Sequence, residues 1–192
     1  MKLKLLLYCE KAKPYLYKTD DTMIEKMDGD YHTQLNKAVL NDNCLNGKIV
    51  AVCDYEVEEI FEELYGDIDW QHDYLPTTNT MSIVNLERES CLSREELYDY
   101  CNGYAIHIKN LHIFDEPKEL SDYFTNEKKI NTLDGCNWVC ESIDRAPQNM
   151  MYAYDSGGNK YILISIKSQW LRKILNGEKT IEIRKKVLKE ML

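Results

Sequence analysis

Four polar side chains near the end of the sequence have types that could bind or transform an anionic ligand. Lys179, Thr180, Glu182 and Arg184 belong to the segment KTIEIR, in which two isoleucines alternate with polar residues. That alternation predicts a strand with a polar face. Arg184 offers a planar fork for a phosphate or carboxylate, and Lys179 offers a point charge. Glu182 could accept a hydrogen bond from a base amino group or act as a general base. The alternative is a solvated strand face with salt bridges.

The residues around this segment predict a compact strand–helix–strand unit. Residues 161–166 form an apolar, β-branched run of strand length. A short helix should follow, with Ser168 as its N-cap and Gly177 as the left-handed residue that ends it. Trp170 lies on the apolar face of that helix and is predicted to belong to the core, with base stacking as the alternative. This strand–helix–strand unit would therefore position the polar side chains of the segment KTIEIR.

The composition fits a single domain in a reducing compartment. The chain has 192 residues, 44% of them hydrophobic, and no apolar run approaches the roughly 20 residues of a membrane helix. The first residues are predicted to be a strand, because the apolar stretch is too short for a signal peptide. Seven cysteines without a framework spacing indicate a cytoplasmic protein.

Charge is distributed unevenly along the chain. The net charge of -9 argues against a general, charge-driven nucleic-acid binder. Residues 167–192 nevertheless contain eight Lys and Arg, beginning with Lys167, and three acidic residues, so this segment carries +5 and the remainder -14. A basic patch on an acidic body fits an anionic ligand that is bound locally. The alternative is an ordinary basic C-terminal tail.

The remaining pattern predicts an α+β domain that spans residues 1–192. Strands are expected at residues 2–8, 47–57, 104–114 and 150–154. Helical segments are expected at residues 94–101, with a capping box, and at 117–121. Residues 18–46 and 66–92 are predicted to be insertions or loops, 125–144 irregular, and 155–159 a flexible linker. Short strands with few helices suggest a small mixed β-barrel.

The block from residue 165 to 184, with its pattern Gly-x-Lys-Thr-x-Glu-x-Arg, resembles the opening motif of the ASCH domain family. Residues 5–11, 47–51, 107–111, 115–120 and 145–148 also resemble ASCH proteins. The resemblance implies a PUA-like small mixed β-barrel with a few short helices. It extends over most of the chain except residues 18–46 and 66–92.

The order of these segments differs from that of the family. There the Gly-x-Lys block comes first and leads into the Leu-Tyr-Cys strand, whereas here the block ends the sequence and the strand begins it. We interpret this as a circular permutation in which residues 155–159, with Ser-Gly-Gly at their centre, join the family's usual termini. Permutation is tolerated where termini lie close together, so the ends of this chain should be near each other.

The resemblance also implies a ligand cleft, lined by Lys179, Glu182, Arg184 and Gln148. PUA-like domains often stack a base on an aromatic ring and read its edge with an amide. Gln148 is therefore the expected reading residue, and Tyr8 or Tyr152 the expected stacking residue.

Two hydrolytic activities occur among proteins that resemble this motif. Some ASCH-like proteins are amidohydrolases that deacetylate a modified cytidine, and they have a threonine at the position of Glu182. Glu182 takes the place of that presumed nucleophile, so the activity cannot simply be carried over. Thr180 lies two residues earlier on the same strand face, but nothing in the sequence places it as a replacement. Others are associated with RNA cleavage, for which Lys179 and Glu182 would be acid–base partners.

Other features carry weaker hypotheses. Cys136 and Cys140 have no second cysteine pair and no nearby histidine, so neither a zinc site nor a cofactor is expected. His107 and His112 are interpreted as core or edge residues. The acidic run at residues 56–63 has a helical pattern and should be a solvated face.

The sequence therefore predicts an ASCH-type domain that binds RNA or a nucleotide by recognising a base, plain or modified. One alternative is a hydrolase in the same cleft, either a ribonuclease or an amidohydrolase of a modified nucleoside. Another is a domain whose acidic surface contacts a protein partner. No membrane contact is expected.

Overall fold

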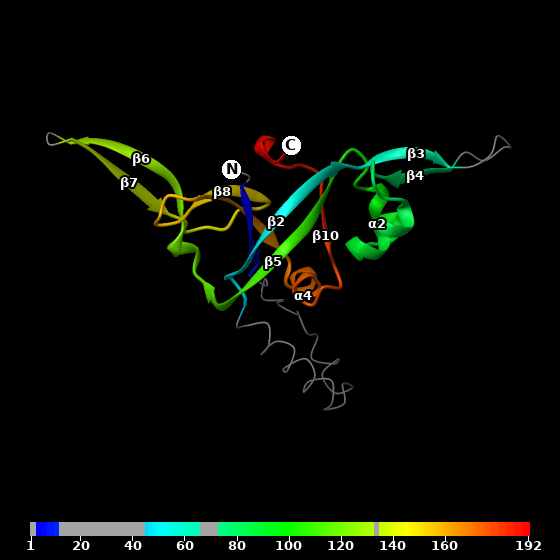
Figure 1. Cartoon of the computed structure of the whole chain (residues 1–192), viewed down its shortest axis with the longest axis horizontal. Coiled ribbons are helices and arrows are strands. Elements are labelled where there is room, and N and C mark those ends of the chain that lie inside the picture. Colours follow the sequence, from blue (N-terminus) through cyan, green and yellow to red (C-terminus); the bar gives the residue numbers. More distant parts are fainter. Residues whose placement is uncertain (1–2, 12–44, 66–72, 133–134) are drawn as a thin grey trace, which may run out of the picture.

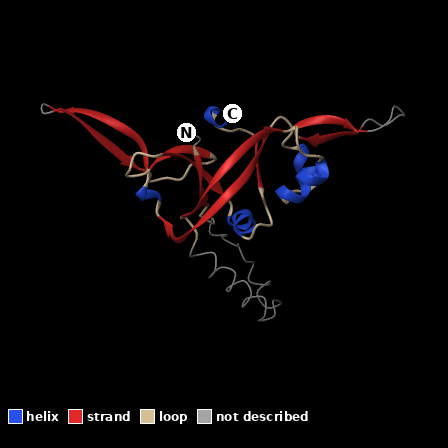
Figure 2. Cartoon of the chain, in the orientation of Figure 1, coloured by secondary structure: helices blue, strands red, loops and turns tan. Residues whose placement is uncertain are grey.

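The computed structural model describes residues 3–11, 45–65, 73–132 and 135–192 (Figure 1, Figure 2). Most of these residues are in strands, which short helices and turns connect. In chain order the elements are β1 (Lys4–Cys9), β2 (Ile49–Glu59), β3 (Phe61–Tyr65), β4 (Asp73–Thr77), α2 (Ile83–Ser90), α3 (Arg94–Tyr98), β5 (Tyr104–Lys118), η2 (Leu120–Asp122), β6 (Phe124–Thr132), β7 (Gly135–Ser142), β8 (Met150–Tyr154), β9 (Lys160–Ile166), α4 (Ser168–Leu175), β10 (Ile181–Arg184) and η3 (Lys189–Met191).

Eight of these strands form one sheet, in the order β10-β5-β2-β1-β9-β8-β6-β7. β1 and β9 run parallel, and the other paired strands of this sheet are antiparallel. β3 and β4 form a separate two-stranded ladder. The fold is therefore α+β and dominated by its sheet. Among the described strands no pairing joins β10 to β7, so the sheet does not close into a barrel.

β1 lies inside the sheet because its side chains are apolar on both faces. Leu5, Leu7 and Cys9 pack in a cluster with α4, whereas Leu6 and Tyr8 pack on the opposite face. A strand that is buried on both faces has a continuous apolar run, and the LLLYC segment of β1 is such a run. This confirms the predicted first strand.

A third cluster fixes the orientation of β10. Ile181 and Ile183 pack against α2 and α3, where Leu86 and Leu97 are fully buried. Because alternate residues of a strand point to opposite faces, Glu182 is directed to the other face, toward α4. α3 begins with the predicted capping box, in which the Ser93 hydroxyl accepts a hydrogen bond from the Glu96 N–H.

Both ends of the described chain lie on the same core cluster. Leu3 and Met191 pack in the cluster that contains Leu5 and α4, and Lys160 at the start of β9 pairs with Glu190 at 2.7 Å. Figure 1 shows the two ends of the chain on the same side of the molecule. The ends are thus close, as the permutation requires. The permutation itself stays a prediction.

Residues 155–159 form a hydrogen-bonded turn between β8 and β9 and not an extended linker. The Asp155 carboxylate accepts hydrogen bonds at 2.9 Å from the backbone N–H groups of Gly157 and Asn159. Gly158 has a φ of 78°, which glycine adopts without steric cost. The turn closes an antiparallel hairpin in which Tyr154 pairs with Lys160.

Three segments differ from the predicted secondary structure. Residues 125–144, expected to be irregular, form most of the β6–β7 hairpin. The range 66–92, expected to be loops, contains β4 and the helix α2. The acidic run at 56–63 is extended in β2 and β3, because Tyr55 and Ile60 near its start are buried in the core. The predicted insertion at 18–46 lies outside the described residues apart from its last two positions.

Two smaller predictions can also be compared with the structure. Residues 104–114, which the pattern predicts to be one strand or two with a break at residues 109–110, belong to one long strand, β5, in which Asn110 has a φ of 49° and the register with β2 shifts nearby. The predicted turn at 117–121 is displaced, because β5 continues to Lys118 and the 3-10 turn η2 follows at Leu120–Asp122.

We expect Tyr123 to make the protein less stable in alkali. Burial, and then the nearby Tyr161 and Asp155, raise the pKa of Tyr123 to about 12. The unfolded phenol releases its proton near pH 10, so stability is lost as the pH rises from about 10 to 12. In Tyr123→Phe, the loss of unfolding free energy between pH 9 and pH 11 should be smaller by about 1 kcal/mol, measured by urea denaturation. The exposed Tyr98→Phe is the control, and an equal pH dependence in both variants would contradict this assignment.

Candidate functional site

The β9–α4–β10 unit positions the predicted site. Leu171 and Ile174 of α4 are 1% exposed in the core, so the helix packs by its apolar face as predicted. Gly177 has a φ of 76°, and its N–H bonds to the carbonyl of Ile174, which ends the helix and turns the chain toward β10. Ser168 is the first helical residue and not the N-cap, which is Lys167 without a side-chain cap bond.

Lys179 is buried behind the site. It is 3% exposed, and its ammonium group donates to the carbonyl oxygen of Ser90, 2.5 Å away at the C-terminal end of α2. It also lies 3.5 Å from a Glu182 carboxylate oxygen and 5.3 Å from the centroid of the Trp170 ring. Burial lowers the pKa of Lys179, and the Glu182 carboxylate opposes that shift. A helix C-terminus and a carboxylate therefore compensate a buried positive charge.

Glu182 links Lys179 to Arg184. One carboxylate oxygen faces Lys179, and the other is 2.9 Å from a terminal nitrogen of Arg184. The same Arg184 nitrogen donates to the Ser165 carbonyl at 2.5 Å, which connects β10 to the end of β9. The Arg184 Nε–H is buried and has no hydrogen-bond acceptor among the described residues. The three charged side chains thus form one network with one unused donor.

This network borders a pocket of about 390 Å³, which we call the Arg184 pocket. It is lined by Glu10, Tyr100, Gln148, Asn149, Lys167, Trp170, Glu182, Ile183, Arg184, Lys185 and Lys186. Four predicted site residues therefore lie together: Gln148, Lys167, Glu182 and Arg184. Lys179 does not line the pocket but contacts it through Glu182.

Three predicted residues lie elsewhere. Thr180 bonds through its hydroxyl and backbone N–H to Glu89 of α2, outside the Arg184 pocket. Tyr8 is 2% exposed in the core cluster on the opposite face of β1. Tyr152 packs its ring under the Lys160 ammonium, 4.0 Å from the ring centroid. The stacking role predicted for Tyr8 or Tyr152 in this pocket is therefore not supported by their positions.

Other residues supply the rings and charges of the Arg184 pocket. Trp170 packs against the core, as predicted, and also lines the pocket. Tyr100 follows α3 and carried no sequence signal. Asn149 adjoins Gln148, and its side-chain carbonyl oxygen is buried without a hydrogen-bond donor from any residue that the structure describes. Lys185 and Lys186 belong to the basic segment that the charge distribution had already identified.

Acidic and metal-binding candidates give no second site. Glu56 pairs with Lys109 at 2.5 Å, and Glu58 accepts hydrogen bonds from Thr78 and Thr80. His107 lies 3.4 Å from Glu58. No group of three His, Cys, Asp or Glu side chains among the described residues is arranged to hold a metal ion. The side chains of Cys136 and Cys140 lie outside the described ones.

Comparison of the chain with protein-family models, curated proteins and solved structures gave no match. In the part of the chain that the structure describes, no helix is long and apolar enough to cross a membrane.

Proposed function

We propose that the chain binds a single-stranded RNA or a nucleotide by placing one base in the Arg184 pocket. The observation that carries this proposal is a pair of unused polar atoms at the pocket. The Arg184 Nε–H needs an acceptor and the Asn149 side-chain carbonyl needs a donor, and neither has a partner in the part of the chain that the structure describes. Leaving such groups unpaired is costly, and the edge of a base presents donors and acceptors side by side. Both atoms are buried in this structure, so the proposal requires the Arg184 and Asn149 side chains to shift when the base binds.

The rest of the pocket supports a nucleotide. Trp170 and Tyr100 contribute aromatic rings on which a base could stack, and Gln148 contributes a second amide. Lys167, Lys185 and Lys186 are exposed at the rim, where they can meet phosphates. A pocket of this size with rings, amides and several cations matches the parts of a nucleotide.

We further propose that the chain is a permuted ASCH-type domain with a PUA-like arrangement of strands. The proximity of Leu3 and Met191 supports the permutation. The β9–α4–β10 unit supports the family proposal, since it folds the Gly-x-Lys block into one strand–helix–strand element with Glu182 and Arg184 at the pocket.

Hydrolysis in the same pocket is a second candidate. Glu182 lines the pocket, and Lys179, whose pKa burial lowers, stands 3.5 Å behind it. Glu182 would then act on the ligand directly, while Lys179 would hold its carboxylate in place. Incubating bound RNA or nucleoside with the protein and analysing the products by mass spectrometry separates turnover from binding.

Calorimetric titration with the four ribonucleoside monophosphates and short RNAs tests the proposal. We expect Gln148→Ala to weaken binding about tenfold, because one amide that reads the base is lost. The matched control is Gln169→Ala, an exposed glutamine of α4 that does not line the pocket. Equal affinities of the two variants for each ligand, or no binding by the unaltered protein, would refute the proposed function.

A further inference from the structure

Two more hollows lie in series with the Arg184 pocket along β1. Glu10, which follows β1, lines the Arg184 pocket. Tyr8 and Glu10 line a second hollow of about 490 Å³, the Arg145 pocket. Leu6 lines a third of about 570 Å³, the Tyr123 pocket. Residues 6, 8 and 10 are alternate positions, which share one face of an extended chain and span about 13 Å.

Shared segments connect each hollow to the next. Residues 144–147 line the Arg145 pocket, and the following Gln148 and Asn149 line the Arg184 pocket. Ser165 also connects the Arg145 pocket with the Arg184 pocket. It lines the Arg145 pocket, and its carbonyl accepts the hydrogen bond from Arg184. Leu120 of η2 lines the Arg145 pocket, and Asp122 at the end of η2 lines the Tyr123 pocket. The three hollows therefore form one track around the end of β1 and across the sheet.

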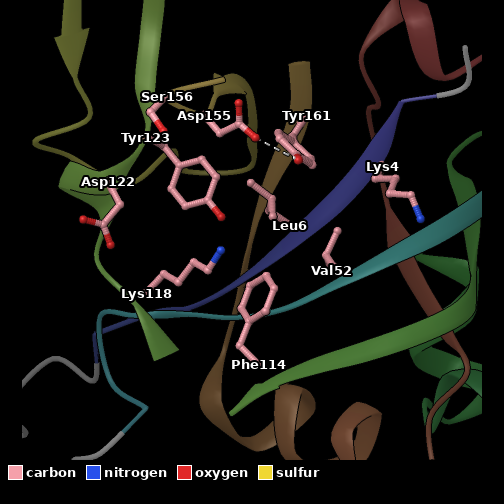
Figure 3. A pocket seen from close by; sticks show the side chains of 10 residues that line it. All are labelled: Lys4, Leu6, Val52, Phe114, Lys118, Asp122, Tyr123, Asp155, Ser156 and Tyr161. Atoms are coloured by element: carbon pink, nitrogen blue, oxygen red, sulfur yellow. Dashed lines mark hydrogen bonds between the residues drawn. The ribbon is translucent and has the colours of Figure 1, made fainter. Parts of the chain in front are cut away.

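The far end of this track has unused polar groups. Figure 3 shows the Tyr123 pocket, in which Leu6 and Val52 form an apolar floor and the Tyr123 and Lys118 side chains point inward. Tyr123 is 4% exposed, and its hydroxyl makes no hydrogen bond with any described residue. Lys118 lies 4.4 Å from the centroid of the Phe114 ring and has no ion-pair partner among the described side chains. Two donors thus converge beside an aromatic ring and an apolar floor.

The charge of the track differs from that of the whole chain. Eight Lys and Arg side chains line the three pockets against five Asp and Glu, an excess of three positive charges on a chain of net charge -9. Some of the acidic residues already have partners in the protein. Glu182 pairs with Lys179 and Arg184, and Asp155 holds the β8–β9 turn. An extended polyanion is therefore favoured here and disfavoured elsewhere on the surface.

We propose that the ligand is an oligonucleotide and not a lone nucleotide, and that a single RNA strand runs from the Arg184 pocket past Arg145 to the Tyr123 pocket. There a second base lies against Phe114, and a phosphate accepts hydrogen bonds from Lys118 and Tyr123. The span along β1 alone is about 13 Å, several times the phosphate spacing of roughly 3.4 Å along a duplex strand. This inference rests on the proposed function of the Arg184 pocket and names its ligand class.

Fluorescence anisotropy with labelled oligouridylates of three and nine nucleotides tests the track. Lys118→Gln should weaken binding of the nonamer about tenfold and leave the trimer unchanged, because the trimer occupies only the Arg184 pocket. The slope of log affinity against log salt for the nonamer should fall by about 0.7, as for one lost phosphate contact on a single strand. Lys109→Gln, which removes an exposed lysine of the same strand outside the pockets, is the matched control.

The outcomes separate the track from the function on which it rests. Equal nonamer affinities for Lys118→Gln and Lys109→Gln would overturn the track, while loss of trimer binding in Arg184→Ala would still uphold the Arg184 pocket. If Lys118→Gln weakens the binding of uridine monophosphate as much as it weakens the binding of the nonamer, the Tyr123 pocket is an isolated nucleotide site. That result would also overturn the track. If Arg184→Ala leaves trimer binding unchanged as well, the proposed function fails.

Discussion

Replacing Glu182 by alanine should lower the free energy of unfolding by about 3–5 kcal/mol, the range expected when a buried ion pair loses one partner. Lys179 is 3% exposed and would lose the carboxylate that opposes the lowering of its pKa by burial, and the Arg184 side chain, 17% exposed, would lose its partner at 2.9 Å. The carbonyl of Ser90 would be the one described acceptor still bonded to Lys179. Urea denaturation followed by circular dichroism measures the change.

The control for this prediction is Glu178→Ala, since Glu178 is an exposed glutamate in the same loop. Its change should stay within about 0.5 kcal/mol, as is usual for exposed positions. A double-mutant cycle of Glu182→Ala with Lys179→Met should show coupling, because the second substitution removes the stranded charge. A Glu182→Ala protein as stable as Glu178→Ala would show that the network is solvated and contributes little.

Replacing Arg184 by alanine should weaken binding of a nucleotide or a short RNA about 100-fold, because charge-assisted and shape-specific hydrogen bonds are lost together. Arg184→Lys should recover little of that loss, since lysine offers a point charge and lacks the planar fork. Glu182 would keep Lys179 as its partner in both variants, so the fold should persist. Calorimetric titration gives the affinities.

Arg88→Ala is the matched control for Arg184, because it removes an exposed arginine on α2 that lies outside the Arg184 pocket. Its affinity should equal that of the unaltered protein. If a folded Arg184→Ala protein binds as tightly as Arg88→Ala, the ligand occupies another part of the surface.

Strand positions were predictable where the apolar pattern is local. β1 and β9 are near-continuous apolar runs, and Gly177 and Ser93 carry cap signals that the structure confirms. The β6–β7 hairpin was missed because its strands pair chiefly with each other, and β6 adds just one pairing, to β8, so neither needs a strong hydrophobic pattern. The acidic run was misread because its extended form depends on pairing with β5 and β4.

Part of the candidate site was predictable for a similar reason. The types and spacing of Glu182 and Arg184 placed both on one strand face, and both line the Arg184 pocket. The burial of Lys179 was not predictable, because the carbonyl that binds it belongs to Ser90, 89 positions earlier. The core position of Tyr8 was not predictable, because a tyrosine serves equally in a core or in a stacking site, and strand order decides which face borders the Arg184 pocket.

The parallel pairing of β1 with β9 has a consequence for the order of folding. Lys4 lies beside Tyr161, so a loop of 157 residues must close before the two strands can pair. Chain entropy opposes that closure, and contacts between distant residues slow folding. During synthesis the apolar β1 segment is made long before β9, so the edge of β1 that pairs with β9 stays uncovered until β9 is made. β2 can cover the other edge of β1 early, so the newly made chain keeps one edge of a hydrophobic strand unpaired through most of translation, which favours aggregation during that time.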